Sequence, residues 1–376
     1  MLLDGIRVLD LTNVLAGPFA SYQLALFGAD VVKVEAPHTG DLARQLGSDP
    51  GLNEDLLGAS FLAQNGGKRS VTVDLKSEEG KETFRKLVAD ADVVLENYRP
   101  GVLARLGFPW ETLKELNPRL VYCAISGFGQ TSPMRARPAY DQVIQGMAGM
   151  MSVTGKPQDA PLRAGYPIAD TMGGLAAAFG VCAALVHRER TGIGCELDVS
   201  MLDTAITALG WAVSNYLIAG TEPAAAGNDN MTSAPSGTFR TADGELNIAA
   251  NKQEQFVALC RTLGRIDLVT DARFVTREDR KANREALQHE LEASLCKESA
   301  LEWEQLLASA GVPAARVLTV PQALDLVPSL IHTLPFPGTP ERTIRVLGNG
   351  IRVNGRPVAP NSPPPLLGEH NNEVLT

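Results

Sequence analysis

The chain has few of the residues that build disulfide frameworks, metal sites or nucleic-acid surfaces. Only five cysteines occur among its 376 residues, odd in number and with no C-x-x-C pair. They are typical of small core residues in a reducing compartment, not of a disulfide or zinc framework. The five histidines show no metal-ligand spacing, so we expect no metal. The net charge of -9 argues against a nucleic-acid or anionic-membrane partner, because both usually require a basic surface.

The N-terminus and the hydrophobic runs carry no targeting or membrane signal. The first residues, MLLDGIRVLDLT, lack the basic and apolar regions of a signal peptide, which predicts a cytoplasmic protein. The longest apolar run, residues 175–186, is too short to span a bilayer and predicts a buried helix. With 44% hydrophobic and 20% charged residues, the composition is that of a soluble globular protein. An anionic ligand would therefore need a local basic pocket.

Three common catalytic motifs are also missing. Where a dinucleotide-binding fold would carry G-x-G-x-x-G, this chain has Asn13-Val-Leu-Ala-Gly-Pro18, with a single glycine. The run Gly66-Gly67-Lys68 lacks the upstream glycine of a phosphate loop, and no G-x-S-x-G elbow occurs. The usual nicotinamide-dependent, P-loop and serine-hydrolase classes are therefore not indicated.

The first half of the chain alternates strand and helix signals. Short β-rich runs are separated by helical segments such as 78–89, which predicts a parallel sheet covered by helices on both faces. We therefore expect an α/β fold with a large Rossmann-like domain. The five strands expected are residues 6–11, 31–34, 70–75, 92–95 and 120–125.

The pattern changes after about residue 192. We predict a large α/β domain from residues 1–195, completed by 310–376, and a smaller α/β domain from residues 237–309. Between them, residues 196–236 are expected to form a linker, because 220–237 is rich in Gly, Ala, Asn, Pro and Ser. Asp243-Gly244 lies between two β-rich runs and predicts a hairpin.

One carboxylate stands out in the middle of the chain. Asp170 precedes Gly173 and Gly174 at the start of the long apolar run, where we expect it to cap the N-terminus of a helix. The helix dipole would favour its ionised form, and the glycines would leave that end open to another molecule. Such a carboxylate is either a plain cap or a nucleophile toward an activated acyl group.

A set of short segments occurs in order along nearly the whole chain. They are Val8-Leu-Asp-Leu-Thr12, Ala16-Gly-Pro18, Gly28-Ala-Asp-Val-Val-Lys-Val-Glu35, Gly40-Asp41, Lys68-Arg-Ser-Val-Thr-Val-Asp-Leu-Lys76, Val94-Leu-Glu-Asn97, Arg99-Pro-Gly101, Ile125-Ser-Gly-Phe-Gly-Gln130, Arg190-Thr-Gly-Ile-Gly194, Asp198-Val-Ser200 and Leu366-Leu-Gly-Glu-His370. Each segment is weak alone, but the ordered set resembles one family, the class III CoA-transferases of the CaiB/BaiF and formyl-CoA transferase type.

The resemblance implies that Asp170 is a nucleophile. In this family an aspartate at this place attacks an acyl-CoA thioester, which gives an acyl-aspartyl anhydride and a CoA thiolate. The thiolate then forms an aspartyl-CoA thioester and releases the donor acid, and the acceptor acid repeats the steps in reverse. A carboxylate suits this chemistry because it both attacks and leaves readily, so no ATP is needed. The resemblance also implies an interlocked homodimer, with acyl-CoA and small carboxylic acids as substrates.

CoA carries three phosphate groups, so the resemblance requires cations near its binding site. We expect Lys76 and Arg105 to contact phosphate or adenine. The positions that the resemblance assigns to CoA binding are Leu15, Ala16, Val73, Leu75, Lys76, Asn97, Tyr98, Arg99, Arg105, Ala139, Tyr140 and Asp141.

Two alternatives to CoA transfer remain open. The α-methylacyl-CoA racemases resemble this chain, but they pair the same aspartate with a histidine directly before the residue that matches Asp141. Here that position is Tyr140, a poor base at neutral pH. A non-catalytic acyl-CoA-binding protein would keep the CoA contacts, with Asp170 serving only as a cap.

Two departures bear on substrate choice. Formyl- and oxalyl-specific members have a glutamine where this chain has Leu15, and a glycine-only loop where it has Gly227-Asn-Asp-Asn-Met-Thr-Ser-Ala-Pro-Ser-Gly237. The later segments look closer to members that act on succinate, mesaconate or citramalate. A second substrate carboxylate would then pair with Arg137, Arg163 or Lys252.

Overall fold

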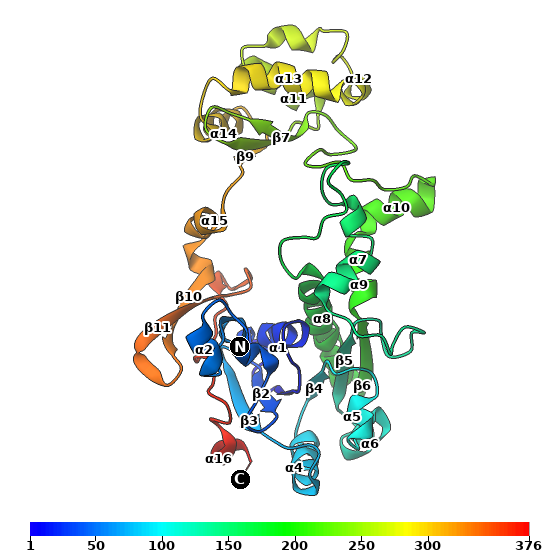
Figure 1. The fold of residues 1–376 in the computed structure, drawn as a ribbon, viewed down its shortest axis with the longest axis vertical. Helices are drawn as coiled ribbons and strands as arrows, with labels where there is room; N and C mark the ends of the chain where they lie inside the picture. The colour runs from blue at the N-terminus through cyan, green and yellow to red at the C-terminus, as the bar shows by residue number, and fades with distance from the viewer. Residues whose placement is uncertain (376) are drawn as a thin grey trace. The chain divides into compact units, whose positions relative to one another are not determined.

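The computed structural model describes residues 1–375, which form two compact units (Figure 1). The first unit contains residues 1–151, 163–223 and 327–375, and the second contains residues 152–162 and 224–326. Residues 196–236, expected as a linker, include most of a strand and two helices of the first unit, followed by coil.

A six-stranded parallel sheet forms the centre of the first unit, which confirms the α/β fold predicted from the sequence. The strand order is β3-β2-β1-β4-β5-β6, and every neighbouring pair is parallel. The order reverses between β1 and β4, and ligands of such sheets bind at the carboxyl ends of the strands near this reversal. The strands are β1 (Arg7–Asp10), β2 (Asp30–Glu35), β3 (Lys68–Thr72), β4 (Val93–Glu96), β5 (Val121–Ser126) and β6 (Cys195–Ser200).

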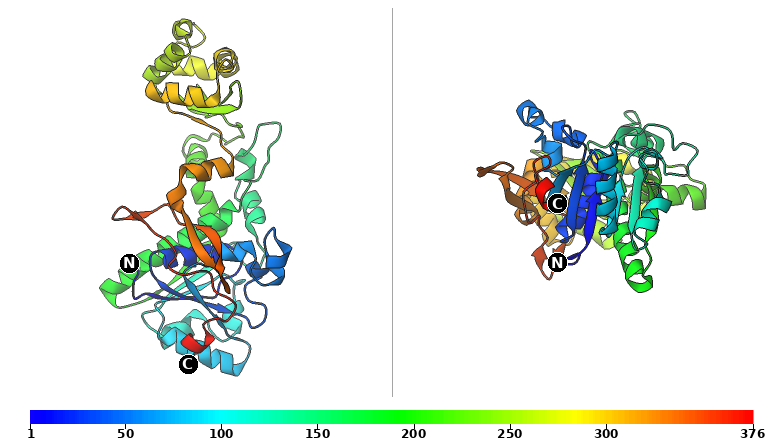
Figure 2. Two further views of the ribbon diagram at one scale, coloured as in Figure 1. Left: turned by 90° about the vertical axis from the view of Figure 1, so that its left-hand side faces the viewer. Right: turned by 90° about the horizontal axis from the view of Figure 1, so that it is seen from below.

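Helices cover both faces of this sheet, as Figure 2 shows. Successive side chains of a strand point to opposite faces, so Val8 packs in one hydrophobic core and Leu9 in the other. The core around Val8 includes α1 (Ala16–Leu26), α7 (Asp141–Met147), α8 (Ile168–Thr191) and α9 (Met201–Ala208). The core around Leu9 includes α4 (Glu78–Ala89), α5 (Val102–Arg105) and α6 (Trp110–Leu116).

The helix α8 is longer than the apolar run that predicted it. By length and composition alone, α8 is long and apolar enough to cross a membrane. It packs against α1, β5 and β6, with Ala177 and Val181 buried. Gly174 permits a close approach to α1, because a Cβ atom there would lie 2.5 Å from the carbonyl oxygen of Ala16. The start of α8 is therefore held directly against the start of α1.

The C-terminal segment returns to the sheet edge formed by β3. The backbone N–H of Thr72 donates to the side chain of Asn371 at 2.8 Å, and the N–H of His370 donates to the carbonyl of Ser70 at 2.9 Å. The remaining elements of the first unit are η1 (Leu42–Gln45), α2 (Pro50–Glu54), α3 (Ala59–Leu62), α10 (Gly210–Ala219), η4 (Pro328–Leu330), β10 (Ile331–Phe336), β11 (Thr339–Leu347), β12 (Arg352–Val353), β13 (Arg356–Pro357) and α16 (Asn371–Val374).

The second unit is a small α/β structure with its own core. Its three-stranded antiparallel sheet has the order β7-β8-β9. The hairpin predicted at Asp243-Gly244 joins β7 to β8, and the N–H of Thr241 donates to the carbonyl of Gly244. Its elements are β7 (Ser236–Arg240), β8 (Glu245–Ala249), α11 (Gln253–Thr262), η3 (Ile266–Val269), α12 (Arg277–Ala282), α13 (Arg284–Leu295), α14 (Ala300–Ser309), β9 (Ala314–Arg316) and α15 (Val320–Leu326). A short η2 (Met151–Val153) lies where the chain first passes between the units.

Candidate active site

A pocket of about 230 Å³ lies at the carboxyl ends of β1, β4 and β5, beside the reversal of strand order. Loops that follow these three strands form much of its wall. The structure brings together eight of the residues predicted from the sequence, which are Leu15, Ala16, Asn97, Tyr98, Arg99, Ala139, Tyr140 and Asp170. The pocket also includes Arg137, which was expected to bind a substrate carboxylate, and residues that were not predicted there, namely Asn13, Val14, Pro100, Ile125, Ser126, Gly127, Arg135, Pro138 and Met201.

Asp170 lines this pocket from the first turn of α8. The helix begins at Ile168, and the residue at its N-cap is Pro167, so the expectation that Asp170 would cap the helix is wrong. The carbonyl of Pro167 already accepts the first helical hydrogen bond, from the N–H of Thr171 at 3.1 Å, so the helix starts before Asp170. Among residues 1–375, no group donates a hydrogen bond to the Asp170 carboxylate. Its oxygens are therefore available to a ligand in the pocket.

Asp141, at the start of α7, is the carboxylate that caps α8. One of its oxygens accepts hydrogen bonds from the N–H groups of Ala169 at 2.8 Å and Asp170 at 3.4 Å. Its other oxygen accepts a hydrogen bond from the side-chain amide of Gln145 at 2.7 Å. Asp141 is buried and is not part of the pocket lining. Because Asp141 accepts these backbone hydrogen bonds, the side chain of Asp170 does not serve as the cap of α8.

The surroundings of Asp170 favour its protonated form. Burial, and then the nearby charge of Asp141, raise the pKa of Asp170 to about 7. The sequence led us to expect an ionised carboxylate, because the dipole of α8 would lower its pKa. Burial and a like charge act in the opposite direction. The group therefore titrates close to neutral pH.

The loop after β1 is fixed at the pocket wall by Asn97. The Asn97 side chain accepts a hydrogen bond from the N–H of Asn13 and donates one to the carbonyl of Asn13, both at 2.8 Å. The loop leads into α1, whose N-cap residue Leu15 makes no side-chain capping bond. Uncapped N–H groups at a helix start suit a negatively charged group.

Three arginines give the pocket a local positive charge on an acidic chain. Arg99, Arg135 and Arg137 line it, and none of them makes an ion pair with a carboxylate of residues 1–375. Arg137 was considered from the sequence as a partner for a substrate carboxylate, but Arg135 was missed. The signal was present, because the two arginines lie two residues apart shortly before Tyr140.

Other predicted residues lie outside the pocket. Val73 and Leu75 are buried in the core around Leu9. Lys76 and Arg105 are exposed, one beyond the end of β3 and the other at the last residue of α5.

Arg163, another candidate for binding a second substrate carboxylate, also lies outside the pocket. The guanidinium of Arg163 is exposed and donates to the carbonyl of Ala164. Lys252 belongs to the second unit.

The pocket has no histidine among its lining residues. The side chain of Tyr140, at the position where a racemase would carry its second base, is 68% exposed. Within residues 1–375, Asp170 is the one acidic group that lines this pocket.

Comparison with known proteins gives one consistent result. A family model described as CoA-transferase family III matches residues 3–371. An acetyl-CoA:oxalate CoA-transferase of Acetobacter aceti is 40% identical over 356 residues, covering 94% of this chain and 88% of that protein. A succinate–glutarate CoA-transferase of Agrobacterium fabrum is 37% identical over 388 residues, covering 99% and 94%. The crystal structure of a CaiB/BaiF family protein from Brucella suis is similar with a TM-score of 0.85 at 36% identity, covering 99% of this chain and 98% of that one.

Proposed function

The chain belongs to CoA-transferase family III and is a CoA-transferase, and from that premise we propose that Asp170 is its nucleophile. The observation that carries the proposal is the position of Asp170. It is an unpaired carboxylate in a pocket at the carboxyl ends of the strands. The family resemblance noted in the sequence is confirmed.

The proposed reaction uses Asp170 twice. Its carboxylate attacks the thioester carbonyl of the donor, the C–S bond breaks, and CoA leaves as a thiolate. The thiolate then attacks the aspartyl carbonyl of the anhydride, which forms an aspartyl-CoA thioester and releases the donor acid. The acceptor carboxylate reverses both steps and regenerates Asp170. The N–H groups at the start of α1 are suitable donors for the oxyanions formed on the way.

We propose a small dicarboxylic acid as the acceptor. Two relatives are named for oxalate and for succinate and glutarate, and these acids all carry a second carboxylate. The unpaired guanidinium groups of Arg135 and Arg137 offer that carboxylate a charge-assisted hydrogen bond. The substitution of Leu15 for the glutamine of formyl- and oxalyl-specific members favours the longer acids.

A screen of donor and acceptor pairs tests the proposed substrate class. The purified chain is mixed with acetyl-, succinyl- or formyl-CoA and one free acid, and the new acyl-CoA is measured by liquid chromatography with mass spectrometry. We expect dicarboxylic acids of four and five carbons to exceed the matched monocarboxylic acids at least about tenfold in kcat/KM, because a lost charge-assisted pair costs about 1.5–3 kcal/mol. Equal rates for glutarate and pentanoate would reject the dicarboxylate assignment.

A whole CoA molecule is too large for a pocket of about 230 Å³. Its phosphates would therefore lie outside the pocket. We propose that Lys76 and Arg105, both exposed, contact the nucleotide part, and that the other residues assigned by the resemblance contribute to the CoA site. If Lys76 meets the 3′-phosphate, Lys76→Ala weakens binding of CoA more than that of dephospho-CoA. Equal losses for the two ligands would place Lys76 elsewhere.

The pH dependence should follow the ionisation of Asp170. Only the carboxylate can attack, and the pKa of Asp170 is raised to about 7, so kcat/KM is expected to fall about tenfold per pH unit below pH 7. Asp141→Asn removes a like charge and should move this limb to lower pH. Initial rates between pH 5 and pH 9 measure both effects. If the acid limb of kcat/KM lies at the same pH in the variant, the charge of Asp141 does not raise the pKa of Asp170.

A racemase would also use a group that titrates near neutral pH, so it is the second candidate. It needs a second proton-transfer group in the pocket, and only the exposed Tyr140 stands at the expected position. Exchange of the α-proton with deuterated water, measured on a 2-methylacyl-CoA, separates the reactions. We expect no exchange above background; rapid exchange would support the racemase.

We further propose that the chain acts as a homodimer in the cytoplasm. The first unit exposes large apolar side chains on two helices, which include Phe179 of α8 and Leu217 and Ile218 of α10, exposed by 78%, 73% and 86%. Contiguous exposed apolar surface in a soluble protein marks an interaction site, and Leu217 and Ile218 are consecutive on α10. A second copy of the chain would cover it, as the family resemblance implies.

The double variant Leu217→Asp/Ile218→Asp tests the dimer. Two charges on a buried apolar interface are expected to weaken self-association at least about 10²-fold, measured by sedimentation equilibrium. Ile266→Asp in the second unit is the matched control, since Ile266 is also an exposed isoleucine. A wild-type chain that sediments as a monomer at micromolar concentration would contradict the proposal.

A further inference from the structure

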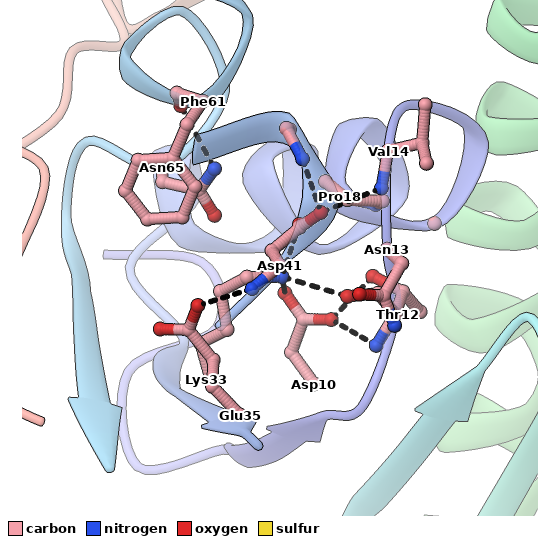
Figure 3. A network of polar contacts seen from close by, with 12 residues as sticks. Asp10, Thr12, Asn13, Val14, Pro18, Lys33, Glu35, Asp41, Phe61 and Asn65 are labelled. Carbon is pink, nitrogen blue, oxygen red and sulfur yellow. Dashed lines mark hydrogen bonds and ion pairs between the residues drawn. The ribbon is translucent and has the colours of Figure 1, made fainter. Parts of the chain in front are cut away.

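Several charged residues of the family motifs have no role in the reaction described above. Lys33, Glu35, Asp41 and Lys68 are all buried and belong to one polar network, part of which Figure 3 shows around Lys33, Glu35 and Asp41. Asp10, at the end of β1, joins this network through a 3.0 Å ion pair with Lys68. Burying so many charges is costly, so they must be paired with one another.

This network holds the backbone of the loop that follows β1. The ammonium group of Lys33 donates to the carbonyl of Thr12 at 2.8 Å and pairs with Asp41 at 3.0 Å. One oxygen of Asp41 accepts hydrogen bonds from the N–H groups of Val14 and Ala43, both at 2.9 Å. Side chains from three separate parts of the chain, the buried Lys33 and Asp41 and the half-buried Asn97, thus bind successive peptide groups of residues 12–14.

Val14 shows why the loop needs this support. Its φ angle is 68°, in the left-handed region that β-branched residues strongly avoid. Such a conformation persists only where the surrounding structure enforces it. The hydrogen bond from the Val14 N–H to Asp41 is the contact that acts on this residue directly. Val14 and the next residue, Leu15, both line the pocket.

We propose that Asp41 is a positioning residue that holds Val14 in the left-handed conformation and so sets the pocket wall formed by residues 13–16. Asp41 itself is not part of the pocket lining. It acts through the loop, while Lys33 neutralises its buried charge. The inference rests on the proposed function of the pocket, because the wall matters only if CoA or an acyl group binds there.

Four variants test the proposal, which are Asp41→Ala, Val14→Gly, and Asp41→Ala combined with either Val14→Gly or Val14→Ala. Without Asp41, Val14 is expected to relax to a negative φ, and a displaced wall of about 1 Å lowers kcat/KM by about 10²-fold. Glycine adopts a positive φ without steric cost, whereas alanine does not. Val14→Gly should therefore recover about tenfold of the loss in the Asp41→Ala background, and Val14→Ala should recover none.

The stability of each variant is measured by thermal unfolding, so that a catalytic loss is separated from a folding defect. Asp49→Ala is the matched control. Asp49 caps α2 as Asp41 caps η1. Asp49 is exposed and lies outside the pocket, so its loss should leave kcat and KM unchanged. Without Asp41, Lys33 keeps only its longer 3.8 Å ion pair with Asp10. If Asp41→Ala does not fold for this reason, Lys33→Met/Asp41→Ala removes both charges together and replaces it in the same comparison.

Unchanged kcat/KM in the variant that lacks Asp41 would overturn the proposal, as would equal effects of glycine and alanine at position 14. A wrong assignment of function to the pocket would give a different result. In that case the wild-type chain exchanges no CoA, and the same variants are compared by their affinity for CoA in titration calorimetry. The glycine-specific recovery of affinity would then still support the role of Asp41, and its absence would reject it.

Discussion

Replacing Asp170 with alanine is expected to lower CoA transfer by about 10⁴-fold or more while CoA binding changes only a few-fold. Loss of a covalent nucleophile removes the route through both intermediates. No other acidic side chain of residues 1–375 lines the pocket, so no group can replace it. Steady-state transfer rates and titration calorimetry with CoA measure the two effects. Transfer at the wild-type rate would reject Asp170 as the nucleophile.

The control for this variant is Asp203→Ala. Asp203 also lies in the first turn of a helix, α9, but it is exposed and outside the pocket. A general loss of helix stability would affect both variants, whereas a lost nucleophile affects only Asp170→Ala. Hydroxylamine added during turnover adds a chemical test, because it converts an activated aspartyl group into a hydroxamate. Mass spectrometry should find this change on the peptide that contains Asp170, and an unmodified peptide would contradict the covalent route.

The sequence was sufficient to predict five strands of the central sheet, but it missed the sixth, β6, most of which was assigned to the linker, and it misplaced some strand limits. Strand signals such as those of residues 31–34 reflect local alternation and β-branched residues, which act over a few residues. The end of β3 was placed three residues too late, because Val73 and Leu75 are apolar and buried although they lie beyond Thr72. A loop whose apolar residues are buried against a core has the same sequence pattern as a strand.

Asp170 was singled out from the sequence and does line the pocket, but its surroundings were not predicted. Asp141 caps α8 from 29 and 28 positions away along the chain, and no local pattern reveals such a pairing. For the same reason the sequence led us to expect an ionised Asp170, whereas burial and Asp141 raise its pKa. The left-handed Val14 was also missed, since nothing in the sequence marks a valine for that conformation.

Arg44→Met is expected to have the largest effect on stability. The guanidinium of Arg44 is fully buried and forms two hydrogen bonds of 2.7 Å with the carboxylate of Glu35. It also donates to the carbonyl of Pro365 and lies 3.7 Å from the ring centre of Phe61. Methionine removes the charge but keeps an apolar chain of similar length. The unpaired charge left on Glu35 should lower the free energy of unfolding by about 3–5 kcal/mol, measured by urea denaturation.

Arg273→Met provides a close control in the second unit. Arg273 also forms a bidentate pair, with Asp271, and also lies over a phenylalanine ring, that of Phe274. Its side chain is 46% exposed, so water compensates for the lost pair and the cost should not exceed about 1 kcal/mol. Equal costs for the two arginines would show that burial does not decide the strength of these pairs.

The double variant Glu35→Gln/Arg44→Met separates an unpaired charge from lost packing. If the uncompensated carboxylate causes the loss, removing its charge should restore part of the stability, because no buried ion is then left alone. Hydrogen exchange should show the same order at the amides of β2 and β3, since Glu35 also accepts a hydrogen bond from the Ser70 hydroxyl at 2.6 Å. Failure of the double variant to recover any stability would assign the cost to the other contacts of Arg44, which are the carbonyls of Leu56 and Pro365 and the ring of Phe61. These contacts, rather than the charge of Glu35, would then be what makes this arginine stabilising.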